Sequence, residues 1–187
     1  MMRWLIDTRR FRTLLVAIVV LGGGWIALSR DFTNRSSAGT SAVPQVGFPA
    51  PDFDLDLLTG SQVKLSELRG SVVIVNLWAS WCGPCRAEMP AIDAVYQQYH
   101  AQGLEVVAIN TTFQDSEAEA RAFLTELGVT FPVALDRDGA ASKRYYLQAM
   151  PSTFFVARDG TIGDMLFGGP MTEALIISKI EKLLGEK

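Results

Sequence analysis

The chain has 187 residues, of which 49% are hydrophobic and 20% charged, and its formal net charge is −3. So apolar a chain is not disordered, and its acidic balance does not suggest a nucleic-acid binder. Two cysteines and one histidine are too few for a disulfide-stapled scaffold or for a structural zinc site with four ligands. Both cysteines, Cys82 and Cys85, lie within one tetrapeptide, and this placement needs an explanation.

The N-terminal end of the chain carries a basic cluster followed by an apolar run. Residues 1–12 contain four arginines against one aspartate, and the next 16 residues are uncharged. As a helix this run would span about 24 Å, slightly less than the hydrocarbon core of about 30 Å. We therefore expect residues 13–29 to form a transmembrane anchor, with residues 1–12 in the cytoplasm by the positive-inside rule. The alternative is a cleaved signal peptide, which would end at Ala27-Leu28-Ser29.

Both interpretations place the rest of the chain outside the cytoplasm. The domain would lie in the periplasm or on the outer face of the cytoplasmic membrane, or would be secreted after cleavage. Residues 30–47 are rich in serine, threonine, glycine and alanine and lack hydrophobic periodicity, which is typical of a flexible tether. Residues 48–187 then form one domain of about 140 residues, long enough for a full core.

Strand and helix patterns alternate along this domain. Continuous apolar runs predict strands buried on both faces, and apolar residues at helical spacing predict the helices. In chain order we expect a strand at 53–57, a helical turn at 65–68, a strand at 72–77, a helix at 84–101, a strand at 106–109, a helix between Ser116 and Gly128, a strand at 131–135, a helix at 140–147, strands at 153–156 and 161–167, and a helix from Thr172. This order predicts a three-layer α/β sandwich with a central mixed sheet.

Three local signals refine these elements. Ser116 and Glu119 form a capping box at a helix start. We interpret Tyr145 and Tyr146 as one core and one surface residue. Apolar spacing in the last helix predicts a set of side chains that face the core: Leu175, Ile176, Ile180, Leu183 and Leu184.

The sequence WCGPC at residues 81–85 lies where the strand at 72–77 ends and a helix begins. The free N–H groups and the positive dipole end of a helix favour a thiolate at Cys82, which we expect to be the exposed nucleophile. Cys85, one turn further along, is expected to be the buried resolving thiol. A disulfide across so short a loop removes little chain entropy, so a purely stabilising bond explains the pair poorly.

Longer stretches around this motif point to a family. The most specific is NLWASWCGPCRAEMP at residues 76–90, and others lie at 50–53, 63–70, 115–136, 150–154 and 167–169. Through them the chain resembles the thioredoxin superfamily, and within it the TlpA/ResA branch of membrane-anchored thiol–disulfide oxidoreductases. The resemblance implies a thioredoxin-like fold preceded by the transmembrane helix. No cofactor or metal is expected.

The resemblance also assigns roles to residues. Cys82 and Cys85 are implied to be the redox pair, joined by a disulfide when oxidised. Pro151 is implied to be a cis proline against this pair, at a cost of about 0.5–1 kcal/mol; the alternative is a proline that only starts a strand. The substrate-binding surface implied around the pair comprises Trp81, Gly83, Pro84, Met150, Pro151 and Ser152, with backbone hydrogen bonds offered at Met150 and Ser152.

Glu88 follows Cys85 by three residues, so both side chains lie on one helix face. In the TlpA/ResA branch an acid at this position belongs to the active site, whereas thioredoxin itself has a buried aspartate at the position of Asn76. Our hypothesis is that Glu88 tunes the thiol pKa values and carries a proton to or from Cys85. The alternative is an ordinary exposed helix glutamate.

The function expected from the motif and the resemblance is that of an extracytoplasmic thiol–disulfide oxidoreductase that reduces protein disulfides. Its expected partners are a protein substrate, with apocytochrome c suggested by the resemblance alone, and a transmembrane thiol protein that supplies electrons. Two alternatives remain open: a thiol peroxidase of the peroxiredoxin-related group, and a non-enzymatic binding or chaperone-like module.

Overall fold

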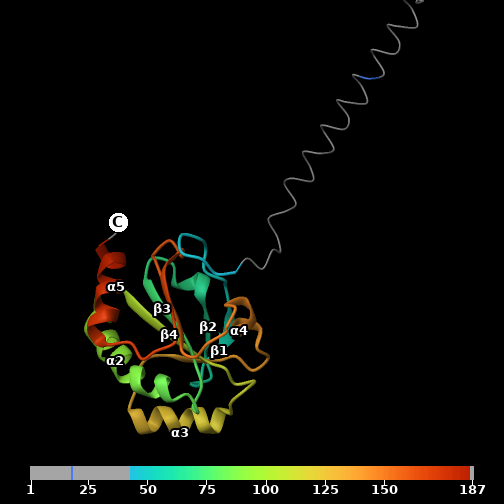
Figure 1. Ribbon diagram of the computed structural model, residues 1–187, viewed down its shortest axis with the longest axis vertical. Coiled ribbons are helices and arrows are strands. Elements are labelled where there is room, and N and C mark those ends of the chain that lie inside the picture. The colour runs from blue at the N-terminus through green and yellow to red at the C-terminus, as the bar shows by residue number, and fades with distance from the viewer. Residues whose placement is uncertain (1–17, 19–42, 186–187) are drawn as a thin grey trace, which may run out of the picture. The chain divides into compact units, whose positions relative to one another are not determined.

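The structure is a computed structural model that describes residue 18 and residues 43–185. Residues 43–185 lie in one compact unit, shown in Figure 1. The expected cytoplasmic segment at 1–12, the expected anchor or signal peptide at 13–29 and most of the expected tether at 30–47 lie outside the described residues. Among the residues that are described, no helix is both long and apolar enough to cross a membrane.

A five-stranded sheet forms the centre of the domain, in the order β5-β4-β3-β6-β7. Its strands are β3 (Val72–Trp78), β4 (Leu104–Asn110), β5 (Val133–Leu135), β6 (Ser152–Val156) and β7 (Ile162–Phe167). β3 pairs in parallel with β4, and β4 with β5, whereas β6 is antiparallel to both β3 and β7. The sheet is therefore mixed, as the element order predicts.

Helices cover both faces of this sheet. One face carries α2 (Gly83–Tyr99), α3 (Glu117–Leu127) and α5 (Glu173–Gly185), whose apolar side chains share a single core cluster with the sheet. α2 and α5 lie side by side in Figure 1 and are in contact. The other face carries α4 (Ala140–Arg144), the 3-10 turn η1 (Leu65–Leu68) and the hairpin of β1 (Asp54–Asp56) and β2 (Gln62–Lys64). A further 3-10 turn, η2 (His100–Gln102), follows α2.

β3 is the strand that positions the site. All seven of its residues are buried, because helices pack on both of its faces. Successive side chains of a strand point to opposite faces, so Asn76 shares a face with Ile74 and Trp78, which pack in the cluster under α2. The chain leaves β3 at Trp78 and enters α2 at Gly83.

Two local predictions are wrong. The helix expected at 140–147 ends at Arg144, because Tyr146 takes a left-handed conformation with φ 51°. Leu175 is 37% exposed instead of facing the core. The buried stripe of α5 runs through Ile176 and Ile180, and a residue adjacent to that stripe in sequence is rotated by about 100° away from it.

Other local predictions are confirmed. The Ser116 side chain accepts a hydrogen bond from the N–H of Glu119 at 3.1 Å, and α3 ends at Gly128 in a left-handed conformation. The capping box is confirmed only in this half, because the N–H of Ser116 donates to Asp115 Oδ1 at 2.8 Å instead of to the Glu119 side chain. Tyr145 is buried and Tyr146 is 52% exposed, as expected of a core and a surface neighbour.

Candidate active site

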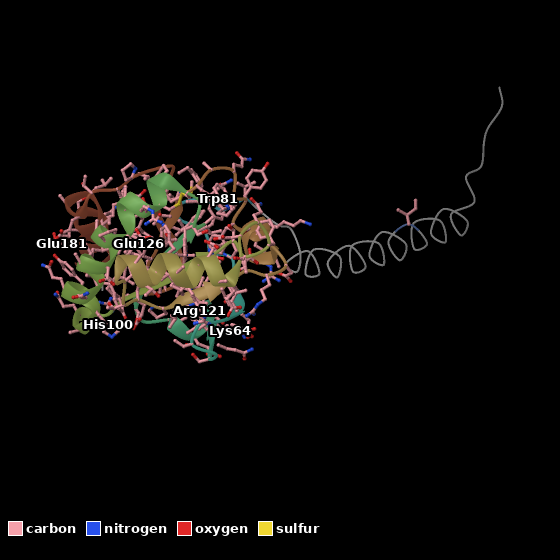
Figure 2. All side chains as sticks on the ribbon, turned by 90° about the horizontal axis from the view of Figure 1, so that it is seen from below. Lys64, Trp81, His100, Arg121, Glu126 and Glu181 are labelled. Atoms are coloured by element: carbon pink, nitrogen blue, oxygen red, sulfur yellow. A yellow bond between two sulfur atoms is a disulfide. The ribbon has the colours of Figure 1, made fainter. Side chains whose placement is uncertain are left out.

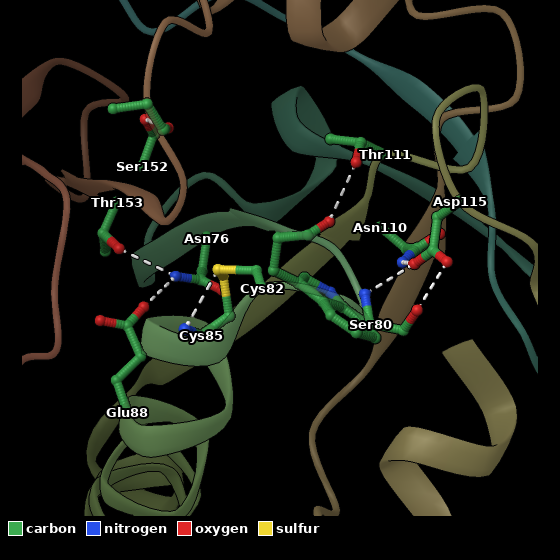
Figure 3. The surroundings of a disulfide bond; sticks show 12 residues. Asn76, Ser80, Cys82, Cys85, Glu88, Asn110, Thr111, Asp115, Ser152 and Thr153 are labelled. Atoms are coloured by element: carbon green, nitrogen blue, oxygen red, sulfur yellow. Dashed lines mark hydrogen bonds between the residues drawn. A yellow bond between two sulfur atoms is a disulfide. The ribbon is translucent and has the colours of Figure 1, made fainter. Parts of the chain in front are cut away.

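The two cysteines form a disulfide at the N-terminus of α2 (Figure 3). Cys82 is the N-cap residue, with extended backbone angles, and its sulfur accepts a hydrogen bond from the N–H of Cys85 at 3.2 Å. Pro84 occupies the first turn, where a missing N–H costs nothing and a fixed φ suits the helix. The motif thus begins a helix and places the Cys82 sulfur at its positive dipole end.

The two sulfurs differ in their access to solvent. Cys85 is fully buried, whereas Cys82 is 5% exposed and lines a hollow of about 500 Å³. The expectation that Cys82 is exposed is therefore wrong for the disulfide form, in which its sulfur is bonded to Cys85. Of the two cysteines, only Cys82 lines the hollow.

The residues expected to bind substrate divide into two groups. Trp81, Gly83, Pro84 and Met150 line the hollow together with Cys82. Trp81 is 60% exposed and is labelled at the surface in Figure 2. Pro151 and Ser152 do not line it and are buried behind it.

The loop before β6 has the conformation that the resemblance implies. The Met150–Pro151 peptide bond is cis, and β6 begins directly after it at Ser152. The Ser152 hydroxyl donates to the carbonyl of Ala149 at 2.6 Å, and the carbonyl of Pro151 accepts from the N–H of Gly168 at 2.7 Å. These two hydrogen bonds stabilise the loop. Met150, which takes part in neither bond, lines the hollow.

Glu88 is fully buried, so the alternative of an exposed helix glutamate is wrong. One carboxyl oxygen accepts from Asn76 Nδ2 at 2.8 Å, and the other accepts from the N–H of Met171 at 3.2 Å. Burial raises the pKa of Glu88 from 4.5 to about 7, although both hydrogen bonds act in the opposite direction. A carboxyl group that titrates near neutrality can give up or take a proton under ordinary conditions.

Asn76 connects this carboxyl group to the neighbouring strand. Its Nδ2 also donates to Thr153 Oγ1 at 2.9 Å, and its Oδ1 is buried without a hydrogen-bond partner. Figure 3 shows Asn76 between Glu88 and Thr153, next to the disulfide. An amide with a free oxygen can accept a hydrogen bond when its neighbour becomes a donor, which is the change that protonation of Glu88 would bring.

A second polar cluster, which the sequence reasoning missed, holds the segment before Cys82. The Asp115 carboxylate accepts from the Ser80 N–H at 2.7 Å, from Ser80 Oγ at 2.6 Å and from Asn110 Nδ2 at 2.8 Å. The indole N–H of Trp81 donates to the carbonyl of Gln114 at 3.1 Å. Burial alone would raise the pKa of Asp115, but the hydrogen bonds from Ser80, from Asn110 and from the N–H of Ser116 together outweigh it and lower the pKa from its usual value. The only signal in the sequence was polar residues that follow the buried strand at 106–109.

A mixed sheet with a cysteine pair at the start of the helix after its central strand, and a cis proline in the loop nearby, defines the thioredoxin-like class. Residues 46–165 match the AhpC/TSA family, and the chain belongs to this family.

Curated relatives and solved structures show which thioredoxin-like proteins this chain is similar to. Thiol-disulfide oxidoreductase ResA of Geobacillus kaustophilus is 30% identical over 172 residues, which cover 92% of this chain and 94% of the relative. ResA of Bacillus subtilis is 34% identical over 150 residues, with 80% and 82% covered. A Chlorobium tepidum crystal structure, assigned as thiol:disulfide interchange protein DsbE, has a TM-score of 0.70 and 36% identity, and the match covers 76% of this chain and 99% of that one. The protein is therefore a thiol–disulfide oxidoreductase.

Proposed function

We propose that the protein reduces disulfides of other proteins outside the cytoplasm, tethered to the membrane by its N-terminal segment. The observation that carries the proposal is the disulfide at the N-terminus of α2, with a buried carboxyl group that titrates near neutrality one turn further along. The basic residues 1–12 and the uncharged run after them support the tether. The names of the ResA relatives support the chemistry.

In the first step, the reduced protein attacks through Cys82. The helix dipole and the N–H of Cys85 stabilise a thiolate at this sulfur. The thiolate attacks one sulfur of the substrate disulfide, a mixed disulfide forms, and the departing substrate sulfur takes up a proton.

In the second step, Cys85 resolves the mixed disulfide. Its thiol must lose a proton before it can attack Cys82, and its burial excludes solvent as the acceptor. Glu88 is buried on the same helix and takes this proton in its carboxylate form. The second substrate sulfur leaves as a thiolate and takes up the proton that Glu88 releases, so the substrate gains two electrons from the cysteine pair and two protons, one from solvent and one that Cys85 gave to Glu88.

Substrate binding is assigned to the rim of the hollow. Trp81, just before α2, Gly83 and Pro84, at its start, and Met150, from the loop before β6, all line it. Pro151 and Ser152 act from behind as supports of that loop. The resemblance suggests apocytochrome c as one substrate, and a transmembrane dithiol protein would return electrons to the oxidised pair.

The direction of electron flow is tested by equilibrating the full-length protein, in mild detergent, with glutathione buffers of graded potential. A reductase is expected to have a midpoint more negative than about −180 mV, the value of protein disulfide isomerase. A midpoint near about −120 mV, typical of a strong periplasmic oxidant, would contradict the proposed direction.

Two further assays address the alternatives. Consumption of a hydroperoxide in preference to a peptide disulfide would favour a peroxidase. An unchanged function in Cys82→Ser would favour a non-enzymatic module.

A further inference from the structure

A second hollow adjoins the one beside the disulfide. It measures about 420 Å³ and is lined by residues of the loop after β4, of the C-terminal part of α4 and of the loop that follows α4. Phe113, Lys143 and Tyr146 are among the residues that line it. It shares three lining residues with the first hollow: Gln114, Leu147 and Gln148. A chain bound at the disulfide therefore has a continuous surface to follow.

Exposed aromatic side chains gather along this surface. Five aromatic side chains of the described residues are strongly exposed, and three of them, Trp81, Phe113 and Tyr146, line the two hollows. The Phe113 ring lies close to Gly139, where a Cβ atom would come within 3.3 Å of it. Clustered exposed apolar side chains mark interaction sites more often than isolated ones.

Tyr146 has an unusual backbone for an aromatic residue. Among the described residues it is the only one other than glycine with a positive φ. Its N–H bonds to the carbonyl of Lys143, and the N–H of Leu147 bonds to the carbonyl of Ser142, which together end α4. Glycine is the residue that best suits this position. The termination of α4 therefore does not explain the aromatic ring, which points to a role for the side chain itself.

We propose that the second hollow, between Phe113 and Tyr146, binds an aromatic side chain of the substrate. That side chain belongs to the extended segment that flanks the substrate cysteine. The inference rests on the proposed function, because the cysteine of this segment would be bonded to Cys82. The backbone N–H groups of residues 148–150 have no hydrogen-bond partner among the described residues, so an extended chain can pair with them as it passes from one hollow to the other.

The test compares two disulfide-linked peptides that differ only in phenylalanine or alanine, scanned over the positions that flank the cysteine. The reduced full-length protein in mild detergent is the electron donor. At the best position, the second-order rate constant for the phenylalanine peptide is expected to exceed that for the alanine peptide by about tenfold, as partial burial of an aromatic ring implies.

Substitutions in the second hollow should reduce this ratio. Tyr146→Gly suits the left-handed backbone and removes the ring, so it is expected to bring the ratio below about two while the melting temperature is unchanged or raised. Phe113→Ala removes the other exposed aromatic ring that lines this hollow and is expected to act in the same way. Phe48→Ala is the control, because this exposed aromatic residue lies beside the start of β7 and lines neither hollow.

Each outcome is decisive. A ratio near one in the unmodified protein, or a high ratio that survives both Tyr146→Gly and Phe113→Ala, would overturn the inference. A failure of the proposed function is distinguishable from this result, because the protein would then reduce neither peptide nor oxidised glutathione.

Discussion

The buried carboxyl group of Glu88 makes the stability of the protein depend on pH. In the folded protein its pKa is raised from 4.5 to about 7, so the folded state binds the proton more tightly than the unfolded state. This contribution to stability is fully present below about pH 4.5 and is lost as the pH rises through about 7. At about 1.4 kcal/mol per pH unit, the loss amounts to about 3 kcal/mol.

Glu88→Gln removes the titration and keeps the shape. The glutamine amide can no longer accept at both positions, but Asn76 can turn its unpartnered oxygen towards the new donor. We therefore expect the lost acceptor to change the unfolding free energy of the variant by about 1 kcal/mol, by the same amount at every pH. The difference in unfolding free energy between unmodified protein and variant should shift by about 3 kcal/mol in favour of Glu88→Gln between pH 4.5 and pH 8.

The assay is guanidinium unfolding of the oxidised full-length protein in mild detergent, at half-unit pH intervals. Glu67→Gln is the matched control, because this glutamate is exposed and its loss removes the same formal charge. A difference between Glu88→Gln and the unmodified protein that stays constant over the whole range would refute the reasoning.

Three other perturbations have defined outcomes. Asp115→Asn turns an N–H group towards donors of Ser80 and is expected to lower the unfolding free energy by about 1–3 kcal/mol, as measured by denaturant titration at pH 7. Gly169→Ala places a Cβ atom 2.8 Å from Glu88 Oε2 and 2.9 Å from Pro151 Cγ; it is expected to lower the melting temperature and slow peptide-disulfide reduction, whereas an alanine at the unobstructed Gly185 leaves both unchanged. After alkaline extraction the full-length chain is expected in the membrane pellet at its full mass; recovery in the soluble fraction, shortened by about 29 residues, would favour the signal peptide.

The central strand and the helix after it could be predicted because their causes are local. An uninterrupted apolar run leaves few alternatives to a doubly buried strand. The residues that follow it supply an N-cap, a proline in the first turn and a periodic apolar face, which specify a helix at Gly83–Tyr99.

The burial of Glu88 could not be derived in this way. It depends on Asn76 and Met171, which come from strand β3 and from the turn before α5. The resemblance gave the position its importance, but no helical periodicity distinguishes an exposed glutamate from one covered by a distant turn. The contact between Asp115 and Ser80 spans 35 positions and was missed for the same reason.

The end of α4 was missed for a different reason. Glycine and asparagine mark left-handed helix ends in a sequence, whereas Tyr146 carries no such signal. The proposed aromatic subsite depends on the same residue, since a side chain in an unfavourable backbone position indicates a role beyond the local fold.

The central claim is that Cys82 attacks and Cys85 resolves. Full-length Cys85→Ser and Cys82→Ser proteins, incubated with the same peptide disulfide and analysed by mass spectrometry without reductant, test it most directly. Cys85→Ser is expected to accumulate a mixed disulfide at Cys82, whereas Cys82→Ser is expected to remain unmodified because its remaining thiol is buried. A peptide adduct that forms as fast on Cys85 in Cys82→Ser would contradict the assigned roles.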